Sequence, residues 1–369
     1  MTTLERLGAD DLRLVVAAFR DALQAHKEGI NRLNVYPVPD GDTGSNMALT
    51  LASVAAELDG VDGDLGAVCK SIGHGALMGA RGNSGVILSQ ILRGLTQTLA
   101  AGADEQVDGA LLAEGLEVAA AGAYEAVGNP VEGTILTVIR VASEGASAAA
   151  ASGAPLVEVL DAARTSGYEA LANTPEQLEV LKQAGVVDAG GTGLMLLIDA
   201  FLFVVDGREV PAASVTEAVA DAGHVDELQV LAHGDEGHER GLADLRYEVM
   251  YILEAPDEAI GAFKDVWAGI GDSIVVVGGD GLFNCHIHTD DIGPAIEAAI
   301  EIGKPSKIRV TDLLEEVEEE RWVREGAEHP APAPTPRPSP RPWWRSPPAT
   351  ASGGSSTPSA HASSPADSR

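Results

Sequence analysis

Asn34-Val35-Tyr36-Pro37-Val38-Pro39-Asp40-Gly41-Asp42-Thr43-Gly44-Ser45-Asn46-Met47 is the most informative stretch of the chain. Asp40 and Asp42 lie one glycine apart on a turn that follows Pro-x-Pro and leads into an apolar helix. Carboxylates this close repel each other unless a cation lies between them. Proteins usually hold Mg²⁺ with one or two carboxylates together with substrate phosphates. The stretch therefore predicts a metal–nucleotide site and phosphoryl transfer near the N-terminus.

The same stretch has three other possible explanations. A Ca²⁺ loop needs Asp or Asn at its fifth position, Gly at its sixth and Glu at its twelfth. This chain has Gly44, Ser45 and Leu51 there, so the calcium loop is excluded. A Walker-type phosphate loop is excluded because Gly-Lys-Ser and Gly-Lys-Thr do not occur. A polar turn whose aspartates merely cap the next helix remains an alternative.

Three further glycine-rich loops occur in the same half of the chain. Residues 79–85 precede the apolar helix 86–92, residues 129–134 precede an apolar run at 135–139, and residues 188–193 precede another at 194–205. Free backbone N–H groups at such helix starts bind anions. Each loop alone could be an ordinary helix start. Because four of them recur between helices of one domain, we expect them to converge on one end of a bundle.

Residues 1 to about 205 resemble the DhaL-type nucleotide-binding domain. This is the helical ATP- or ADP-binding part of dihydroxyacetone kinases and the catalytic domain of bacterial fatty acid kinase. The resemblance rests on residues 34–47, on Gly-Ala-Arg-Gly-Asn-Ser-Gly-Val-Ile at 79–87, on Glu-Gly-Thr-Ile-Leu at 132–136 and on Asp-Ala-Gly-Gly-Thr-Gly at 188–193. All four segments match the fatty acid kinase branch.

The resemblance implies a set of functional residues. The family's aspartate cluster binds two Mg²⁺ ions that bridge the nucleotide phosphates, which makes Asp40 and Asp42 catalytic metal ligands here. The glycerone-kinase branch has a third aspartate where this chain has Val35, and we expect the side-chain oxygen of Asn34 to replace it. Arg81 is either a stabiliser of the transferred phosphoryl group or a surface arginine at a loop edge. The other implied nucleotide contacts are Thr43, Gly44, Ser45, Asn46, Ser84, Gly85, Thr134, Asp188, Gly190 and Gly191.

Composition narrows the class of protein. The chain has 369 residues, enough for two domains with their own cores. Its formal net charge of −32 argues against nucleic acid or an anionic membrane surface as a partner. The N-terminus lacks the basic start and apolar core of a signal peptide, and the longest apolar run is too short to cross a membrane. The two cysteines make no disulfide framework. We expect a cytoplasmic protein without membrane insertion.

Helical periodicity dominates the first half of the chain. Leu12, Val15, Val16, Phe19 and Leu23 recur at helical spacing, and alanine and glycine are abundant. This predicts an all-α bundle or barrel over residues 1–206. Residues 207–244 are acidic and weakly periodic, which predicts a linker. The linker contains His224, His233 and His238, but their loose spacing favours a solvated segment over a metal site.

A second, smaller domain is predicted over residues 245–325. Strands are expected at 247–254, 273–277, 282–288 and 307–310, and helices at 256–268 and 294–302. Thr311 is expected to cap a further acidic helix that runs to about Trp322. The resulting order β-α-β-β-α-β is typical of a ferredoxin-like α/β fold. This domain is also a possible homodimer contact.

His286 and His288 lie on the third predicted strand and point to one face. They can ligate Zn²⁺ if a third ligand comes from elsewhere. The middle domain of fatty acid kinases carries a similar His-x-His strand with a partner cysteine on an earlier strand. Here Arg246 aligns with that cysteine and Cys285 faces away from both histidines. We therefore expect an incomplete zinc site, and a structural face or a subunit contact as the role of the pair.

The tail, residues 326–369, is rich in Pro, Ser, Ala and Arg, which predicts disorder. Fatty acid kinases of this type continue into a further folded domain that engages the acyl carrier. The change of composition leads us to expect that this chain lacks that domain, as a frameshift or a lineage-specific truncation would produce.

The resemblance implies an ATP- and Mg²⁺-dependent phosphotransferase that resembles the catalytic subunit of fatty acid kinase. It would phosphorylate the carboxylate of a fatty acid presented by a separate DegV-like binding protein, giving an acyl phosphate, although the missing docking domain weakens the case for this partner. One alternative is transfer to a small keto sugar, as in dihydroxyacetone (glycerone) kinase. The other is a non-catalytic nucleotide-binding regulatory protein.

Overall fold

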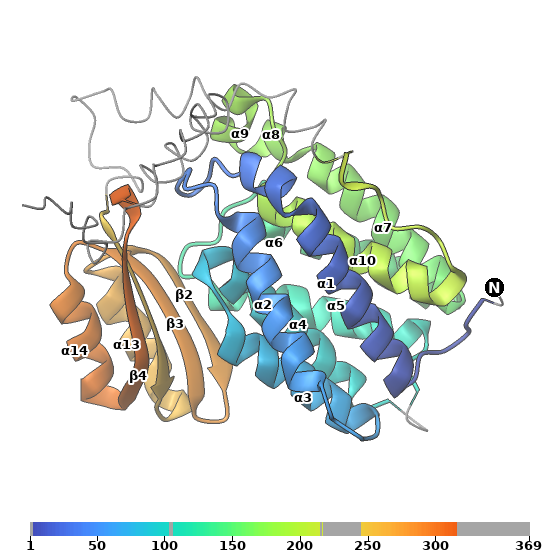
Figure 1. The fold of residues 1–369 in the computed structure, drawn as a ribbon, viewed down its shortest axis with the longest axis horizontal. Coiled ribbons are helices and arrows are strands. Elements are labelled where there is room, and N and C mark those ends of the chain that lie inside the picture. Colours follow the sequence, from blue (N-terminus) through green and yellow to red (C-terminus); the bar gives the residue numbers. More distant parts are fainter. Residues whose placement is uncertain (1–2, 103–105, 215, 217–244, 316–369) are drawn as a thin grey trace, which may run out of the picture. The chain divides into compact units, whose positions relative to one another are not determined.

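Eight long helices of the N-terminal half close into a ring in the part of the chain that the structure describes (Figure 1). The structure is a computed structural model, and it describes residues 3–102, 106–214, 216 and 245–315. Each long helix packs against the next along the chain, and the last one packs against both α7 and α1. The ring consists of α1 (Ala9–Arg32), α2 (Thr43–Leu58), α3 (Leu65–Gly79), α4 (Gly82–Leu99), α5 (Gly109–Ala126), α6 (Ile135–Ala151), α7 (Leu156–Ala172) and α10 (Ala189–Asp206), with the short α8 (Thr174–Gln177) and α9 (Glu179–Ala184) before the last. The predicted all-α barrel is confirmed.

Helix α10 forms the best-buried side of this ring. It contacts α1, α6 and α7 as well as α2. It is also the one helix among the described residues that is long and apolar enough to cross a membrane, and 72% of its apolar window is buried. That burial is typical of a core helix, because a soluble bundle must place its most apolar helix where other helices cover it.

The second domain has the predicted order of elements. It consists of β1 (Tyr247–Glu254), α13 (Ile260–Ala268), β2 (Asp272–Gly279), β3 (Leu282–Thr289), α14 (Ile292–Ile302) and β4 (Lys304–Asp312), with a short 3-10 turn, η3 (Asp257–Ala259), before α13. The antiparallel sheet has the order β2-β3-β1-β4, and α13 and α14 cover one face of it (Figure 1). The β-α-β-β-α-β prediction is confirmed.

Strand β4 is longer at both ends than the predicted strand, which corrects the prediction for Thr311. Its hydroxyl donates to Glu248 within the sheet at 3.3 Å, so Thr311 does not cap a helix. Instead Asp312 accepts the N–H of Leu314 at 3.1 Å. The rest of that predicted helix, the linker from 217 to 244 and the tail lie outside the described residues.

The two faces of the sheet belong to two different cores. Side chains alternate along a strand, so Tyr251 and Cys285 pack under α13 and α14, whereas Met250, Val275 and Val277 join the core of the helical ring. Backbone contacts reinforce this second packing, because Gly128 N–H donates to the carbonyl of Ile274 at 2.8 Å. Both domains lie in one compact unit, Met1–Arg324. The sheet is therefore fixed against the helices that carry the glycine-rich loops of the first half.

Candidate functional site

The loop between α1 and α2 brings Asp40 and Asp42 together. Asn34 is buried and its amide donates to Asp40 at 2.5 Å, while Asp42 N–H points to the same carboxylate at 3.4 Å. Asp42 occupies the N-cap position of α2 but makes no capping hydrogen bond. Its carboxylate accepts from the amide of Asn46 at 2.5 Å. The simple helix-capping explanation therefore does not account for Asp42.

A small pocket of about 330 Å³ surrounds these two aspartates, and we call it the carboxylate pocket. Its walls include Glu248 and His288 from the sheet as well as Ser84 from the start of α4. Burial raises the pKa of Asp42, and the charge of Glu248 raises it further, against the hydrogen bonds from neighbouring side chains. Three carboxylates that converge in a half-buried pocket are the ligand type that hard divalent cations prefer. The side-chain chemistry of the pocket thus fits Mg²⁺.

A larger pocket of about 730 Å³ opens beside it, and we call it the helix-end pocket. It lies where Thr43, Ser84, Thr134 and Asp188 mark the N-terminal ends of α2, α4, α6 and α10. The predicted convergence of the four loops is therefore observed. Helix N-termini present unpaired N–H groups and a partial positive charge, which favours anions. The residues common to both pockets are Pro37, Thr43, Asn83 and Ser84, so the two are contiguous.

Asp188 is the deepest titratable group of the helix-end pocket. It is 6% exposed and caps α10 by accepting Gly191 N–H at 2.6 Å. Burial raises its pKa to about 6, although hydrogen bonds from backbone N–H groups oppose the shift. A buried carboxylate is costly unless it has a task or a partner. Asp188 thus combines a structural capping bond with a wall position in the pocket.

Strand β2 supplies another wall of the helix-end pocket. Asp272, Ser273, Ile274 and Val275 line it. Sequence reasoning did not find these residues, because nothing in the sequence places β2 against the ends of α4 and α6. The pocket is consequently built from both domains.

The residues implied by the family resemblance divide into two groups. Those that line the carboxylate or helix-end pocket are Asn34, Asp40, Asp42, Thr43, Asn46, Ser84, Thr134, Asp188 and Gly190. Five others line neither pocket, namely Gly44, Ser45, Gly85, Gly191 and Arg81. Gly44 and Ser45 face α1, where Ser45 N–H donates to Asn31 at 3.0 Å. Gly85 packs on Thr50, and Gly191 packs on Val138 and Leu171.

Arg81 points into a third pocket. Its guanidinium donates to the carbonyls of Gly79 and Ala80 at 3.2 and 2.9 Å. Together with Lys307 and Arg309 of β4 it lines a space of about 490 Å³, which we call the cation pocket. Arg81 therefore lies next to the carboxylate pocket in sequence but does not line it.

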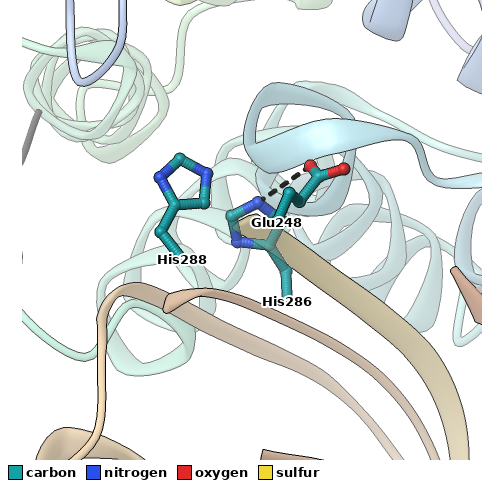
Figure 2. Close-up of side chains that lie close together, drawn as sticks. All are labelled: Glu248, His286 and His288. Atoms are coloured by element: carbon teal, nitrogen blue, oxygen red, sulfur yellow. Dashed lines mark hydrogen bonds and ion pairs between the residues drawn. The ribbon is translucent and has the colours of Figure 1, made fainter. Parts of the chain in front are cut away.

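Glu248, His286 and His288 form a cluster on the sheet face that borders the carboxylate pocket (Figure 2). One ligand atom from each lies within 4.8 Å of the others. Glu248 stands directly across from His288 in the β1–β3 register. Glu248 thus lies where it could serve as a third ligand, whereas the family resemblance places that ligand at Arg246. The expectation of an incomplete zinc site stays a prediction. Arg246 instead pairs with Asp312 at 2.7 Å, and Cys285 faces the opposite core as predicted.

Both ring nitrogens of His286 face acceptors. Nδ1 lies 2.8 Å from the carbonyl of Ser273, and Nε2 lies 3.1 Å from a carboxylate oxygen of Glu248. Nε2 and the Glu248 carboxylate are thus close enough to serve as ligands of one cation. Burial, together with the neighbouring His286, lowers the pKa of His288 to about 3. The neutral His288 ring has a buried Nδ1 without a partner among the described residues, so the cluster fits a divalent cation such as Zn²⁺.

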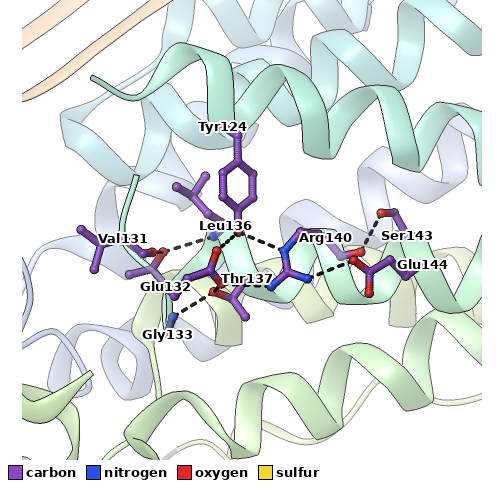
Figure 3. A network of polar contacts seen from close by, with 10 residues as sticks. Tyr124, Val131, Glu132, Gly133, Leu136, Thr137, Arg140, Ser143 and Glu144 are labelled. Carbon is purple, nitrogen blue, oxygen red and sulfur yellow. Dashed lines mark hydrogen bonds and ion pairs between the residues drawn. The ribbon is translucent and has the colours of Figure 1, made fainter. Parts of the chain in front are cut away.

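A polar network holds the loop that leads into α6 (Figure 3). Arg140 donates to Glu132 at 3.0 Å and to the hydroxyl of Tyr124 at 3.2 Å, and Tyr124 in turn donates to Glu132 at 2.8 Å. Thr137 donates to the same carboxylate at 2.6 Å and accepts Gly133 N–H at 2.8 Å. The network ties together α5, α6 and the loop whose residues Val131 and Thr134 line the helix-end pocket.

Comparisons with known proteins match both domains of the chain. The DAK2 domain family matches residues 37–203, and the FakA-like middle-domain family of fatty acid kinases matches residues 244–320. Protein YloV of Bacillus subtilis (strain 168) is 35% identical over 308 residues, which cover 82% of this chain and 55% of YloV. An uncharacterized protein of Staphylococcus aureus (strain USA300) is 36% identical over 290 residues, covering 78% of this chain and 52% of that protein.

The chain thus spans about half the length of the curated relatives it matches. Among solved structures, the dihydroxyacetone kinase from C. freundii in complex with AMP-PNP and Mg²⁺ is 23% identical, with a TM-score of 0.38. The match covers 53% of this chain and 33% of that one. A likeness this remote carries no argument about the site.

Proposed function

The chain belongs to the family that joins a DAK2 domain to a FakA-like middle domain of fatty acid kinases, and from this premise we propose that it is an ATP- and Mg²⁺-dependent kinase that phosphorylates a fatty acid carboxylate. The acceptor would be held by a separate fatty-acid-binding protein, and the product would be an acyl phosphate. The observation that carries the proposal is the continuity of the carboxylate pocket with the helix-end pocket.

The carboxylate pocket supports the metal part of the proposal. Asp40 and Asp42 would hold Mg²⁺, and Asn34, which donates to Asp40, would orient that carboxylate. When bound, the ion would neutralise the charge of the β- and γ-phosphates. Burial, and after it the charge of Glu248, raises the pKa of Asp42 and so disfavours its lone carboxylate. A cation bound there would offset both effects.

The helix-end pocket supports the nucleotide part. The phosphates would lie at the starts of α2 and α4, beside Thr43 and Ser84, where the two pockets meet. The nucleoside would then extend into the larger space, towards Asp188 and the β2 wall. Asp188 is placed to accept a hydrogen bond from a hydroxyl or amino group of the nucleoside.

The transfer step needs no general base. A carboxylic acid is already ionised near neutral pH, so its oxygen can attack the γ-phosphorus directly. The bond from that phosphorus to the bridging oxygen breaks, and ADP leaves with the electron pair. Residues of this chain then have to position the two reactants and stabilise negative charge, which is how most phosphoryl transfer is accelerated. Arg81 is proposed as a charge stabiliser on the acceptor side.

The test uses the purified full chain with Mg²⁺-ATP. ADP release and acyl phosphate, trapped as the hydroxamate, are measured with a fatty-acid-loaded DegV-like binding protein and separately with dihydroxyacetone. The proposal expects acyl phosphate only with the loaded binding protein. Phosphorylation of dihydroxyacetone instead would show that the acceptor is a small keto sugar and not a fatty acid. Tight ATP binding without any transfer would indicate a regulatory nucleotide-binding protein.

The site assignment has its own control. The double variant Asp40→Ala/Asp42→Ala should lose Mg²⁺-dependent nucleotide binding while its helical circular dichroism remains. Asp59→Asn/Asp62→Asn changes two exposed carboxylates just beyond the end of α2 and should bind like the wild type. Unchanged ATP affinity in the first variant would overturn the assignment.

A further inference from the structure

The cation pocket is lined by both domains of the protein. Arg81 comes from the turn between α3 and α4, and Lys307 and Arg309 come from β4. Apolar groups complete the walls, among them Met78 and Ile252. The space of about 490 Å³ therefore combines positive charge with apolar surface.

The three cations lack carboxylate partners among the residues that the structure describes. By contrast, other arginines of the fold pair with carboxylates, namely Arg140, Arg164, Arg208 and Arg246. Burial lowers the pKa of Arg81, and the charge of Arg309 lowers it further. Like charges held together without an acid form a site that an anion would complete.

Strand β4 is irregular where it contributes to this pocket. The β1–β4 register shifts between Met250 and Ile252, and Lys307 has a φ of 53°. A lysine in the left-handed region is strained, and bulges re-aim side chains near functional sites. At this bulge, Lys307 and Arg309 both line the cation pocket.

Asn284 is a buried polar residue of the pocket wall. It is 4% exposed and its amide nitrogen donates to the carbonyl of Leu77 at 2.9 Å. Its amide oxygen is buried in the pocket wall and has no donor among the described residues. An amide oxygen can only accept a hydrogen bond, so it would pair with a donor and not with an oxyanion. The anion-binding character of the pocket therefore comes from its three cations.

The cation pocket adjoins the carboxylate pocket along three segments of chain. On β1, Glu248 lines the carboxylate pocket and Met250 lines the cation pocket. These two residues are neighbours on one face of the strand, about 7 Å apart. On β3, Asn284 lines the cation pocket and His288, four residues later, lines the carboxylate pocket. Arg81 directly precedes Gly82, which lines the carboxylate pocket at the start of α4.

We propose that the cation pocket binds the carboxylate head group of the acceptor and, after transfer, the acyl phosphate that replaces it. The inference rests on the proposed function, since it gives that reaction its acceptor site. The cations of Lys307 and Arg309 hold the oxyanion, while Met78, Met250 and Ile252 cover the first methylenes of the chain. An oxyanion here lies beside the place where the γ-phosphate is held.

The test measures binding separately from catalysis. Octanoate binding to the full chain is followed by calorimetry, with inorganic phosphate as a second probe, and Mg²⁺-ATP affinity is measured without acceptor. The variant is Lys307→Ala/Arg309→Ala, two exposed side chains of β4. The matched control is Lys304→Ala, an exposed lysine of the same strand that does not line the pocket. Arg309→Lys tests whether charge alone restores binding.

The proposal expects the double variant to bind octanoate at least about tenfold more weakly, with Mg²⁺-ATP affinity unchanged. With a fatty-acid-loaded binding protein, KM for the acceptor should rise while KM for ATP stays constant. Equal octanoate affinity in wild type and double variant would overturn the proposal even if the kinase is active. Saturable phosphate binding without octanoate binding would also overturn it. Octanoate binding that depends on Lys307 and Arg309 in a chain without kinase activity would support the pocket and refute the proposed function.

Discussion

The negative charge of Asp42 is unfavourable in the folded protein, because its carboxylate is buried. Its carboxylate is largely removed from solvent and lies near Glu248, and both effects raise its pKa. We predict that Asp42→Asn melts at the same or a higher temperature than the wild type in Mg²⁺-free buffer at pH 7. If Asp42 holds Mg²⁺ as proposed, the gain in melting temperature caused by Mg²⁺-ATP should fall, because the variant would bind Mg²⁺-ATP more weakly. Differential scanning calorimetry with and without Mg²⁺-ATP measures both effects.

Asp59→Asn is the control for that substitution, since Asp59 is exposed at the other end of α2. It should leave both melting temperatures unchanged. A variant at position 42 that loses stability in the absence of metal, or keeps the full Mg²⁺-ATP shift, would contradict the prediction.

Asp188 should give the fold a distinctive pH dependence. Its pKa is raised from 3.8 to about 6, mainly by burial. The folded state therefore keeps this proton at pH values where the unfolded state has lost it, and the contribution of Asp188 to stability rises as pH falls from about 7 to 4. The shift corresponds to roughly 3 kcal/mol. Urea unfolding between pH 4 and 7.5 should show this difference between wild type and Asp188→Asn.

Asp108→Asn provides a matched comparison for Asp188. Asp108 caps α5 by accepting Leu111 N–H at 3.0 Å, which is the same kind of bond, but it is exposed. Its substitution should not alter the slope of stability against pH. Parallel pH profiles for wild type and Asp188→Asn would show that burial does not shift this carboxyl group.

At the scale of elements, the α5–α6 connection is held by side chains outside the pocket that it helps to form. Arg140 bridges Glu132 and Tyr124 (Figure 3). We predict that Arg140→Ala weakens ATP binding by about 3- to 10-fold with little change in melting temperature, because misplaced positioning groups lower affinity while exposed ion pairs contribute little stability. Nucleotide titration and hydrogen exchange of residues 128–134 measure the effect.

Glu144→Ala is the control for Arg140→Ala. Glu144 also pairs with Arg140, at 3.0 Å, but it lies a turn further along α6 and does not touch the loop. Its removal should leave ATP affinity and loop exchange unchanged. Equal effects of the two variants would show that the loop does not depend on this network.

The elements themselves were largely predictable from the sequence, and so was the end of the bundle where the loops meet. The spacing of apolar residues predicted the helices and the strands. The loops that contain Asp42, Thr134 and Asp188 indicated where helices begin. The third member of the Glu248–His286–His288 cluster was not predictable, because the strand register that puts Glu248 opposite His288 is a long-range property. The orientation of Gly44 and Gly85 was not predictable either, since a helix start does not reveal which side packs against a neighbour.

For the whole molecule, the sheet and the helical ring share one core. Val277 is 1% exposed and packs with residues of the helices, whereas Val276 on the same strand packs in the sheet's own core. We predict that Val277→Ala and Val276→Ala each lower the free energy of unfolding by about 1–2 kcal/mol. Only Val277→Ala should also weaken ATP binding, because it loosens the packing of β2 against the helices and so shifts the pocket wall that β2 forms.

Chemical unfolding followed by both tryptophan fluorescence and helical circular dichroism tests this coupling. Among the described residues the tryptophan is Trp267 in α13, which reports on the sheet domain. Coincident transitions are expected for the wild type. Transitions that separate by more than the experimental error in the wild type would show that the two domains unfold independently.

The closed ring has a consequence for the order in which the protein is made. Helix α10 closes the ring between α7 and α1. The N-terminal segment binds to α10, because Leu4 N–H donates to the carbonyl of Val205 at 2.8 Å. Asp188, at the start of α10, lines the helix-end pocket. A nascent chain that has left the ribosome only as far as α7 lacks the pocket walls that α10 and β2 supply, and it lacks the partner of its first helix. A ligand of this pocket would therefore stabilise by mass action a fold in which α10 and β2 are both in place.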